Sequence, residues 1–283
     1  MRSCVNVITV GFAGTFCLMP EKMRLDRLLV SRGLFESRSS AAGSVLAGEV
    51  RIGSDGERAL KPGMLVPEDV GISVLERPRY VSRGGLKLER ALAELDLDVS
   101  GRQCLDVGAS TGGFTDCLLQ AGAAHVVAVD VAYGELDWRI RNDERVTVLE
   151  RHNARDLDPA DLPYEPEVIT IDVSFIGLSK VLPAVVSCAA PQFDLVALVK
   201  PQFELSRERV GKGGVVRRPD DRLDALVSVG EAARDLSLTV KGYCSSGLPG
   251  PAGNRESFIW CTEPGRAGVE ALRSAAREAE PQG

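Results

Sequence analysis

From residue 86 onward, short apolar runs alternate with segments of helical periodicity. The runs cover residues 103–107, 126–130, 168–171, 195–199, 239–245 and 257–261, and the helical segments include 87–95, a helix from about 113, and 220–236. Strands that alternate with helices indicate a parallel sheet with helices on both faces. The pattern therefore predicts an α/β fold with a doubly wound, Rossmann-like sheet. Ligands of such sheets bind beyond the carboxyl ends of the strands.

A glycine-rich segment follows the first of these runs. Asp106 lies at the strand end, Gly108, Gly112 and Gly113 follow, and a helix is expected from about Phe114. Glycines let the backbone approach a ligand, and the first N–H groups of a helix attract an anion or a polar group. The spacing differs from the Gly-x-Gly-x-x-Gly of a dinucleotide site, and the acidic Asp106 suits the amino group of S-adenosylmethionine. A tight structural turn is the alternative interpretation.

The next strands add polar groups to the same edge of the sheet. Asp130 ends the second strand, where a carboxylate binds the ribose hydroxyls of an adenosine cofactor, and Asn153 and Ala154 lie at the expected adenine position. Trp138 and Phe175 are candidates for flanking the cofactor or the substrate, or for core packing. The predicted cofactor is S-adenosylmethionine, and its predicted contacts are Asp106, Gly108, Ala109, Ser110, Thr111, Gly112, Gly113, Phe114, Asp130, Asn153, Ala154 and Asp172.

Four charged residues form a candidate catalytic set. Asp172 and Lys200 each follow an apolar run directly, Glu256 precedes the last run, and Lys87 lies on the helix before the first strand. A lysine held near a cationic sulfonium and a second lysine is favoured in its neutral form, and a neutral amine removes a proton from a hydroxyl. The two carboxylates are expected to hold the lysines and to orient a substrate ribose. Solvated charges at strand ends are the alternative for each residue taken alone.

The order Lys87, Asp172, Lys200, Glu256 resembles the K-D-K-E tetrad of the FtsJ/RrmJ-like 2′-O-ribose methyltransferases. Longer segments resemble the TlyA (hemolysin A) family, and the resemblance covers roughly residues 23–265. These segments are 82–88, 106–116, 199–204, 211–216 and 248–256. The resemblance implies a class I methyltransferase domain that modifies cytidine in small-subunit, and often also large-subunit, ribosomal RNA. Ribosomal RNA or ribosomal subunits would then be the partners, in the cytoplasm.

The resemblance also implies that residues 23–80 form an S4-like RNA-binding domain. Within it, residues 37–47 have the pattern of a helix that Ser37 or Ser39 caps and Gly48 ends. Residues 23–80 hold nine Lys/Arg and eight Asp/Glu, so this module is scarcely basic overall. Tyr80 is available for stacking on a base. The candidate RNA contacts, which would position a phosphate backbone, are Arg24, Arg27, Arg32, Arg38, Arg51, Arg79 and Arg83.

Composition and segment boundaries complete the expectation. The net charge is −6, which excludes coating of nucleic acid by charge alone. Two histidines and seven scattered cysteines predict no metal site, and no run approaches the roughly 20 apolar residues that span a bilayer, so no membrane partner is expected. The expected parts are a disordered extension (1–22, with an upstream start codon or a weak signal peptide as alternatives), the S4-like domain (23–80), a linker (81–85), the methyltransferase domain (86–265) and a polar terminal helix or tail (266–283).

Other functions compete with methyl transfer to ribosomal RNA. The hemolysin name of the family suggests a membrane-active protein, although only residues 5–19 are mildly apolar. An RNA-binding protein with a degenerate methyltransferase site is a second alternative, and the intact tetrad argues against it. A family member that acts on another hydroxyl substrate is a third, because no recognisable motif encodes the contacts to the base.

Overall fold

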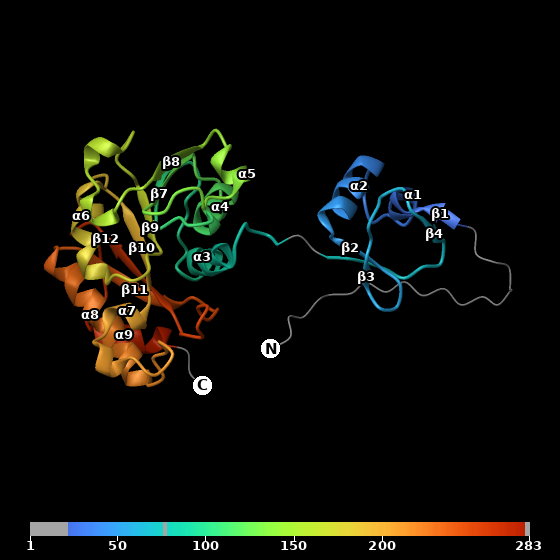
Figure 1. Ribbon diagram of the computed structural model, residues 1–283. Helices are drawn as coiled ribbons and strands as arrows, with labels where there is room; N and C mark the ends of the chain where they lie inside the picture. Colours follow the sequence, from blue (N-terminus) through green and yellow to red (C-terminus); the bar gives the residue numbers. More distant parts are fainter. Residues whose placement is uncertain (1–21, 76–77, 281–283) are drawn as a thin grey trace. The chain divides into compact units, whose positions relative to one another are not determined.

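The computed structural model describes residues 22–75 and 78–280 and divides the chain into two compact units, residues 1–78 and 79–283 (Figure 1). The expected extension therefore lies outside the described residues except for Lys22, which begins the first strand instead. Within the described ranges, every helix is too short or too polar to cross a membrane.

The first unit is a small α+β module with its own core. Ser37 Oγ accepts the N–H of Ser40 and caps α2, and Gly48, at φ +79°, ends it in the left-handed conformation, as expected. Its elements are β1 (Lys22–Arg24), α1 (Leu25–Ser31), α2 (Arg38–Ala47), β2 (Val50–Ile52), β3 (Glu57–Arg58), β4 (Leu65–Pro67) and β5 (Ile72–Val74). β1 pairs with β4, and a second sheet has the order β3-β2-β5. The core consists of Leu25, Leu28, Leu29, Ala41, Val45, Val50, Ala59 and Val66.

The second unit is built around a seven-stranded sheet of order β11-β12-β10-β9-β6-β7-β8. The strands are β6 (Gln103–Val107), β7 (His125–Asp130), β8 (Val146–Glu150), β9 (Val168–Ile171), β10 (Asp194–Val199), β11 (Thr239–Ser245) and β12 (Ser257–Thr262). The helices are α3 (Arg83–Glu94), α4 (Gly113–Gln120), α5 (Trp138–Arg141), α6 (Leu182–Ser187), α7 (Pro201–Glu204), α8 (Pro219–Asp235) and α9 (Leu272–Ala279), and short 3-10 turns cover Ala154–Asp156, Pro159–Asp161, Leu178–Lys180 and Arg207–Arg209.

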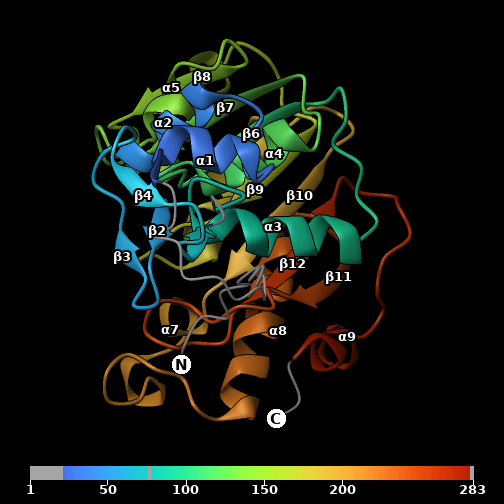
Figure 2. The same ribbon diagram turned by 90° about the vertical axis from the view of Figure 1, so that its right-hand side faces the viewer.

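Two hydrophobic cores make this unit a three-layer sandwich. One face of the sheet packs against α3, α4 and α5, through residues such as Leu88, Leu118 and Ile140. The other face packs against α6, α8 and α9, through residues such as Leu182 and Leu226. The two sets of helices lie on opposite sides of the strands in Figure 1. Figure 2 shows α3 in front of β11 and β12. Strand residues alternate between the two cores, as the pleat of a sheet requires.

The prediction of a parallel sheet needs one correction, in β12. This strand is antiparallel to both β10 and β11. Its first residue, Ser257, therefore pairs with Val199, the last residue of β10. A residue that precedes β12 consequently lies at the edge where the parallel strands end, which is the edge that binds ligands in such sheets.

The predicted linker is wrong, and of the two alternatives for the terminal segment, a polar helix or a tail, the structure has the helix. Arg83 and the two glycines after it form the first turn of α3, with Ser82 Oγ accepting the N–H of Gly84. Tyr80 is only 4% exposed and packs directly on Gly85, so its ring is not available for stacking on RNA. At the other end, α9 packs on α8 and β11, because Leu272 and Ala276 are buried.

Candidate active site

Two lysine–carboxylate pairs meet in one cleft at the carboxyl edge of the sheet. Lys87 Nζ, from α3, lies 2.5 Å from Glu256 Oε2, just before β12. Lys200 Nζ, after β10, lies 2.6 Å from Asp172 Oδ1, after β9, and 3.0 Å from Ser174 Oγ. All five residues line a cleft of about 450 Å³, which we call the acceptor cleft. The structure thus brings together the four residues that the sequence singled out.

The two pairs differ in their access to solvent. The side chains of Lys87 and Glu256 are 9% and 1% exposed, whereas those of Lys200 and Asp172 are 12% and 24% exposed. A desolvated charge is stable only while its partner remains, so the first pair is a fixed wall of the cleft. The second pair is accessible, and Asp172 also lines a neighbouring cavity. Asp172, the partner of Lys200, therefore lies at the boundary between the two.

The glycine-rich segment separates the acceptor cleft from that neighbouring cavity. Gly108 has φ +85°, and a Cβ there would lie 2.6 Å from the carbonyl oxygen of Asp172, so only glycine lets the two segments approach. Ser110 follows with φ +48°, and its N–H donates to Asp130 Oδ2 at 2.7 Å. The N–H of Ala132 donates to the other oxygen of Asp130 at 2.7 Å. Each oxygen of Asp130 keeps a lone pair for a ribose hydroxyl.

The neighbouring cavity has a volume of about 1000 Å³, and we call it the cofactor cavity. Six predicted cofactor contacts line it: Gly108, Ser110, Asp130, Asn153, Ala154 and Asp172. Four others, Ala109, Thr111, Gly113 and Phe114, line the acceptor cleft. A carboxylate at the end of β7, a glycine cradle beside it and a long cavity suit the ribose and adenine of S-adenosylmethionine, so the residues present fit this cofactor.

Asp106 and Gly112, although predicted as cofactor contacts, line neither the cofactor cavity nor the acceptor cleft. Asp106 is fully buried, and its two oxygens accept hydrogen bonds from Thr115 Oγ1 at 2.6 Å and from Thr170 Oγ1 at 3.1 Å. Burial raises the pKa of Asp106 to about 7. Its carboxyl group therefore joins β6 to α4 and to β9. Gly112, at φ +92°, packs closely against Leu136.

Comparisons with known proteins agree with this geometry. The family model for FtsJ-like methyltransferases matches residues 80–263. The chain belongs to the FtsJ-like methyltransferases. The 16S/23S rRNA (cytidine-2′-O)-methyltransferase TlyA of Mycobacterium tuberculosis is 46% identical over 94% of this chain and 100% of that protein. Hemolysin A of Brachyspira hyodysenteriae is 43% identical over 69% of this chain and 81% of that protein. A solved structure from Streptococcus thermophilus covers 93% of this chain and 96% of its own, at 40% identity and a TM-score of 0.68.

One residue of this FtsJ-like methyltransferase escaped the sequence analysis, although it lies inside the segment 199–204. Glu204 Oε1 accepts the N–H of Leu178 at 2.9 Å, and burial raises the pKa of Glu204 to about 7. The segment that follows Asp172 is thus held at one end by Lys200 and at the other by Glu204. The signal available in the sequence was a carboxylate four residues after Lys200, at the end of the short helix that Lys200 precedes.

The two aromatic candidates, Phe175 and Trp138, do not pack in the core. Phe175 is 91% exposed, has φ +65° and lines the cofactor cavity, with its ring 5.3 Å from that of Phe203. Trp138 is 75% exposed. Core packing is therefore wrong for both. A non-glycine residue with positive φ is uncommon, so the backbone of the methyltransferase holds the Phe175 ring out in solvent at an energetic cost.

Several candidate RNA contacts have partners within the protein. Arg24 and Arg38 both pair with the buried Asp26, and this holds the pKa of Asp26 well below its usual range. Arg32 donates to two backbone carbonyls, and Arg79 pairs with Glu89. Of the others in this group, Arg27 is exposed and Arg51 is half-buried. Arg83 alone among the seven lines the acceptor cleft, where it donates to the carbonyl of Pro249 at 3.4 Å. The methyltransferase domain thus carries a cation at the entrance of its own cleft.

Proposed function

We propose that this chain transfers the methyl group of S-adenosylmethionine to the 2′-hydroxyl of a cytidine in ribosomal RNA, in the small subunit and also in the large subunit. The observation that carries the proposal is the convergence of Lys87–Glu256 and Lys200–Asp172 in one cleft. The 46% identical TlyA protein, named for this reaction on 16S and 23S RNA, supports the substrate class.

The residues of the cleft have distinct roles in this reaction. The bound cofactor supplies a methyl carbon made electrophilic by its sulfonium. Lys200 acts as the neutral amine: its Nζ would accept the proton of the 2′-hydroxyl while the hydroxyl oxygen takes the methyl group and the carbon–sulfur bond breaks, and Asp172 Oδ1, 2.6 Å away, would balance the ammonium that results. Lys87, held by Glu256, donates a hydrogen bond to the acceptor ribose and keeps it in place.

Positioning accounts for much of the expected rate. Methyl transfer is an in-line displacement, so the acceptor oxygen must face the methyl group from the side opposite the leaving sulfur. Gly108, Ser110, Asp172 and Ser174 line both the cofactor cavity and the acceptor cleft, which makes them the shared wall at which the two ligands meet. The backbone of Gly108 lies close to the carbonyl oxygen of Asp172, so this shared wall is thin.

RNA recognition draws on both units in this proposal. The first unit would act as the S4-like module, with its exposed arginines on phosphates. In the second unit, Arg83 would meet a phosphate at the acceptor cleft, and the exposed ring of Phe175 would offer a stacking surface to an unpaired base. The partner is ribosomal RNA or a ribosomal subunit in the cytoplasm.

Transfer of labelled methyl groups to ribosomal RNA, mapped by mass spectrometry, tests the proposal. The wild-type chain should add a 2′-O-methyl group to cytidine, and Lys200→Ala should abolish the transfer. Lys241→Ala is a suitable control, because Lys241 is a surface residue of β11 that donates to the carbonyl of Ala267. Normal transfer by Lys200→Ala would refute the role of Lys200 as the base.

Two further measurements separate the alternatives. Calorimetric titration with S-adenosylmethionine, with and without RNA, should give binding, whereas its absence favours an RNA-binding protein with a degenerate site. The hemolysin name of one relative is tested with purified chain lacking residues 1–22. Lysis of cells at low concentration by that chain would favour the membrane-active alternative.

A further inference from the structure

The amine of Lys200 has two oxygen partners of different kinds. Lys200 Nζ donates a hydrogen bond to Ser174 Oγ at 3.0 Å. Its contact with Asp172 Oδ1 is an ion pair of 2.6 Å, and within the described ranges that carboxylate oxygen has no partner with hydrogen-bond geometry. Asp172 therefore supplies charge beside the amine, whereas the hydroxyl of Ser174 supplies the directional contact.

Ser174 lies in a segment that packs along α7, the short helix that Lys200 precedes. The ring of Phe175 lies 5.3 Å from the ring of Phe203 on α7. Further along the segment, the N–H of Leu178 donates to Glu204 Oε1 at the end of the same helix. The distance between the hydroxyl and the amine is therefore set by the packing of two neighbouring segments.

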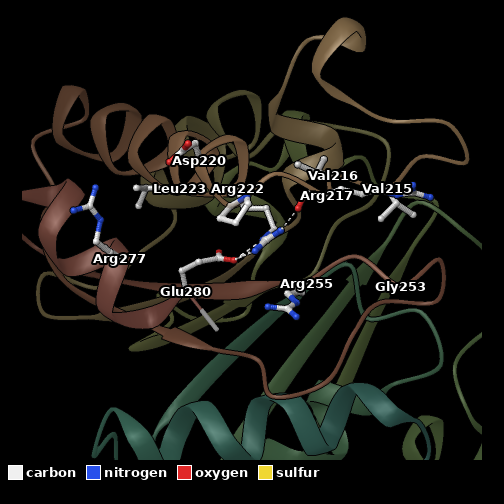
Figure 3. A pocket seen from close by; sticks show the side chains of 11 residues that line it. Val215, Val216, Arg217, Asp220, Arg222, Leu223, Gly253, Arg255, Arg277 and Glu280 are labelled. Carbon is white, nitrogen blue, oxygen red and sulfur yellow. Dashed lines mark hydrogen bonds and ion pairs between the residues drawn. The ribbon is translucent and has the colours of Figure 1, made fainter. Parts of the chain in front are cut away.

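A cation elsewhere in this unit has the same two kinds of partner. In a cavity of about 490 Å³ at the start of α8 and the end of α9, the guanidinium of Arg222 pairs with the carboxylate of Glu280 (Figure 3). The same guanidinium donates to the carbonyl oxygen of Arg217 at 2.9 Å. A carboxylate offers several lone pairs, so the added neutral oxygen is what fixes the direction of the cation. Only 6% of the Arg222 side chain is exposed, so that arrangement is structural.

The amine of Lys200 differs from this guanidinium because it lies in a cleft that a substrate can enter. A neutral amine has two N–H groups and one lone pair, in tetrahedral directions. If one N–H is directed to Ser174 Oγ and the other to Asp172 Oδ1, the lone pair takes the direction that remains. All three residues line the acceptor cleft, so this direction is left for a hydroxyl bound there.

We propose that Ser174 is a positioning residue of the methyl transfer. Its Oγ accepts an N–H of Lys200 and thereby turns the lone pair of the amine toward the 2′-hydroxyl of the acceptor ribose. This inference rests on the proposed function. A general base must be aligned with the proton that it removes, so the loss of this contact should lower the rate of transfer without changing the affinity for either substrate.

The test compares Ser174→Thr with Ser174→Val in the full chain. The two new side chains have nearly the same shape, and only threonine keeps the hydroxyl. Ser174 is exposed, so both variants should fold with the melting temperature of the wild type. Single-turnover transfer to ribosomal RNA, at saturating RNA and S-adenosylmethionine, should fall about tenfold in Ser174→Val, the effect of losing a hydrogen bond to a charged group. Ser174→Thr should restore most of this rate, and both variants should bind RNA and S-adenosylmethionine as the wild type does.

The contact itself is measured without RNA, by acylation of lysines with an amine-reactive reagent and peptide mass spectrometry. An amine that has lost one of two partners moves more freely. Lys200 should therefore be labelled about threefold faster in Ser174→Val than in the wild type or in Ser174→Thr, relative to Lys241 of β11. Ser187→Ala is the matched control for both measurements, because Ser187 is an exposed serine of α6 that donates to the carbonyl of Ala184.

The outcomes are separable from those of the proposed function. A wild-type chain that transfers no methyl group contradicts the proposed function, and the labelling of Lys200 still decides whether Ser174 holds the amine. Equal labelling of Lys200 in Ser174→Val and the wild type overturns the contact. With an active wild type, equal transfer rates in Ser174→Thr and Ser174→Val overturn the positioning role. A weaker affinity for RNA that accounts for the whole loss in Ser174→Val overturns it in favour of direct substrate binding by Ser174.

Discussion

Lys87 Nζ and Glu256 Oε2 lie 2.5 Å apart, although 169 residues separate them in the chain. The contact exists because α3 crosses the sheet on one face and β12 enters it in the antiparallel direction. The pair joins the first helix of the methyltransferase domain to its last strand. The pair is also buried, because only 9% of the Lys87 side chain and 1% of the Glu256 side chain are exposed.

Removing one member of the Lys87–Glu256 pair should destabilise the protein more than removing both members. We expect Lys87→Met to lower the free energy of unfolding by about 3 kcal/mol or more, because Glu256 is left as an unpaired buried charge. The double variant Lys87→Met with Glu256→Gln should recover part of that loss, while methyl transfer stays absent in both. Urea unfolding measures the cycle. Equal destabilisation of the single and double variants would contradict the pairing.

Alanine at Gly108 should weaken cofactor binding, whereas alanine at Gly134 should not. Both have positive φ, so alanine at either position costs about 1 kcal/mol of backbone strain. A Cβ on Gly108 would lie 2.6 Å from the carbonyl of Asp172, whereas one on Gly134 meets nothing within 4 Å. Calorimetry should therefore show at least tenfold weaker binding of S-adenosylmethionine to Gly108→Ala and normal binding to Gly134→Ala. Similar affinities for both would argue against the close approach.

Asp106 should make the stability of the protein fall as pH rises from about 4 to 7. Burial raises its pKa to about 7 in the folded chain, against about 4 in the unfolded chain, so folding takes up a proton in this window. Each such group lowers the free energy of unfolding by about 1.4 kcal/mol per pH unit there. Glu204, with a pKa also raised to about 7, acts in the same window.

The variant Asp106→Asn should therefore give a shallower pH dependence than the wild type between pH 5 and 6.5. Asparagine keeps the shape of the side chain and can still bond to Thr115 and Thr170. Urea unfolding at several pH values measures the slope. Identical curves for the variant and the wild type would mean that Asp106 is ionised throughout.

Glu204 should act on the reaction through the position of the segment that begins at Asp172. Glu204→Gln keeps an acceptor for the N–H of Leu178 and should retain methyl transfer within about twofold. Glu204→Leu leaves that N–H without a partner, which costs about 1 to 3 kcal/mol, and single-turnover transfer should fall about tenfold. Affinity for RNA should be the same in both variants. A loss in Glu204→Gln equal to that in Glu204→Leu would point to the charge instead.

Local patterns predicted the elements well. Alternating apolar runs placed the strands of the sheet, and the cap of α2 at Ser37 with its end at Gly48 follows from the residues alone. Such features depend on neighbours a few positions apart, which a sequence displays directly. The linker at 81–85 was predicted wrongly because the glycines at the start of α3 have no local sign of the partners against which they pack.

The sequence by itself determined the glycine-rich segment, the order of the four charged residues and the family resemblance. Only the tertiary structure decided that Glu256 lies beside Lys87, because the direction of β12 depends on its pairing with β10. It also decided that Asp106 is buried and accepts hydrogen bonds from Thr115 and Thr170, because these contacts are properties of the packed chain. Residue types and spacing follow from the chain, whereas the partner of each charge follows from long-range packing.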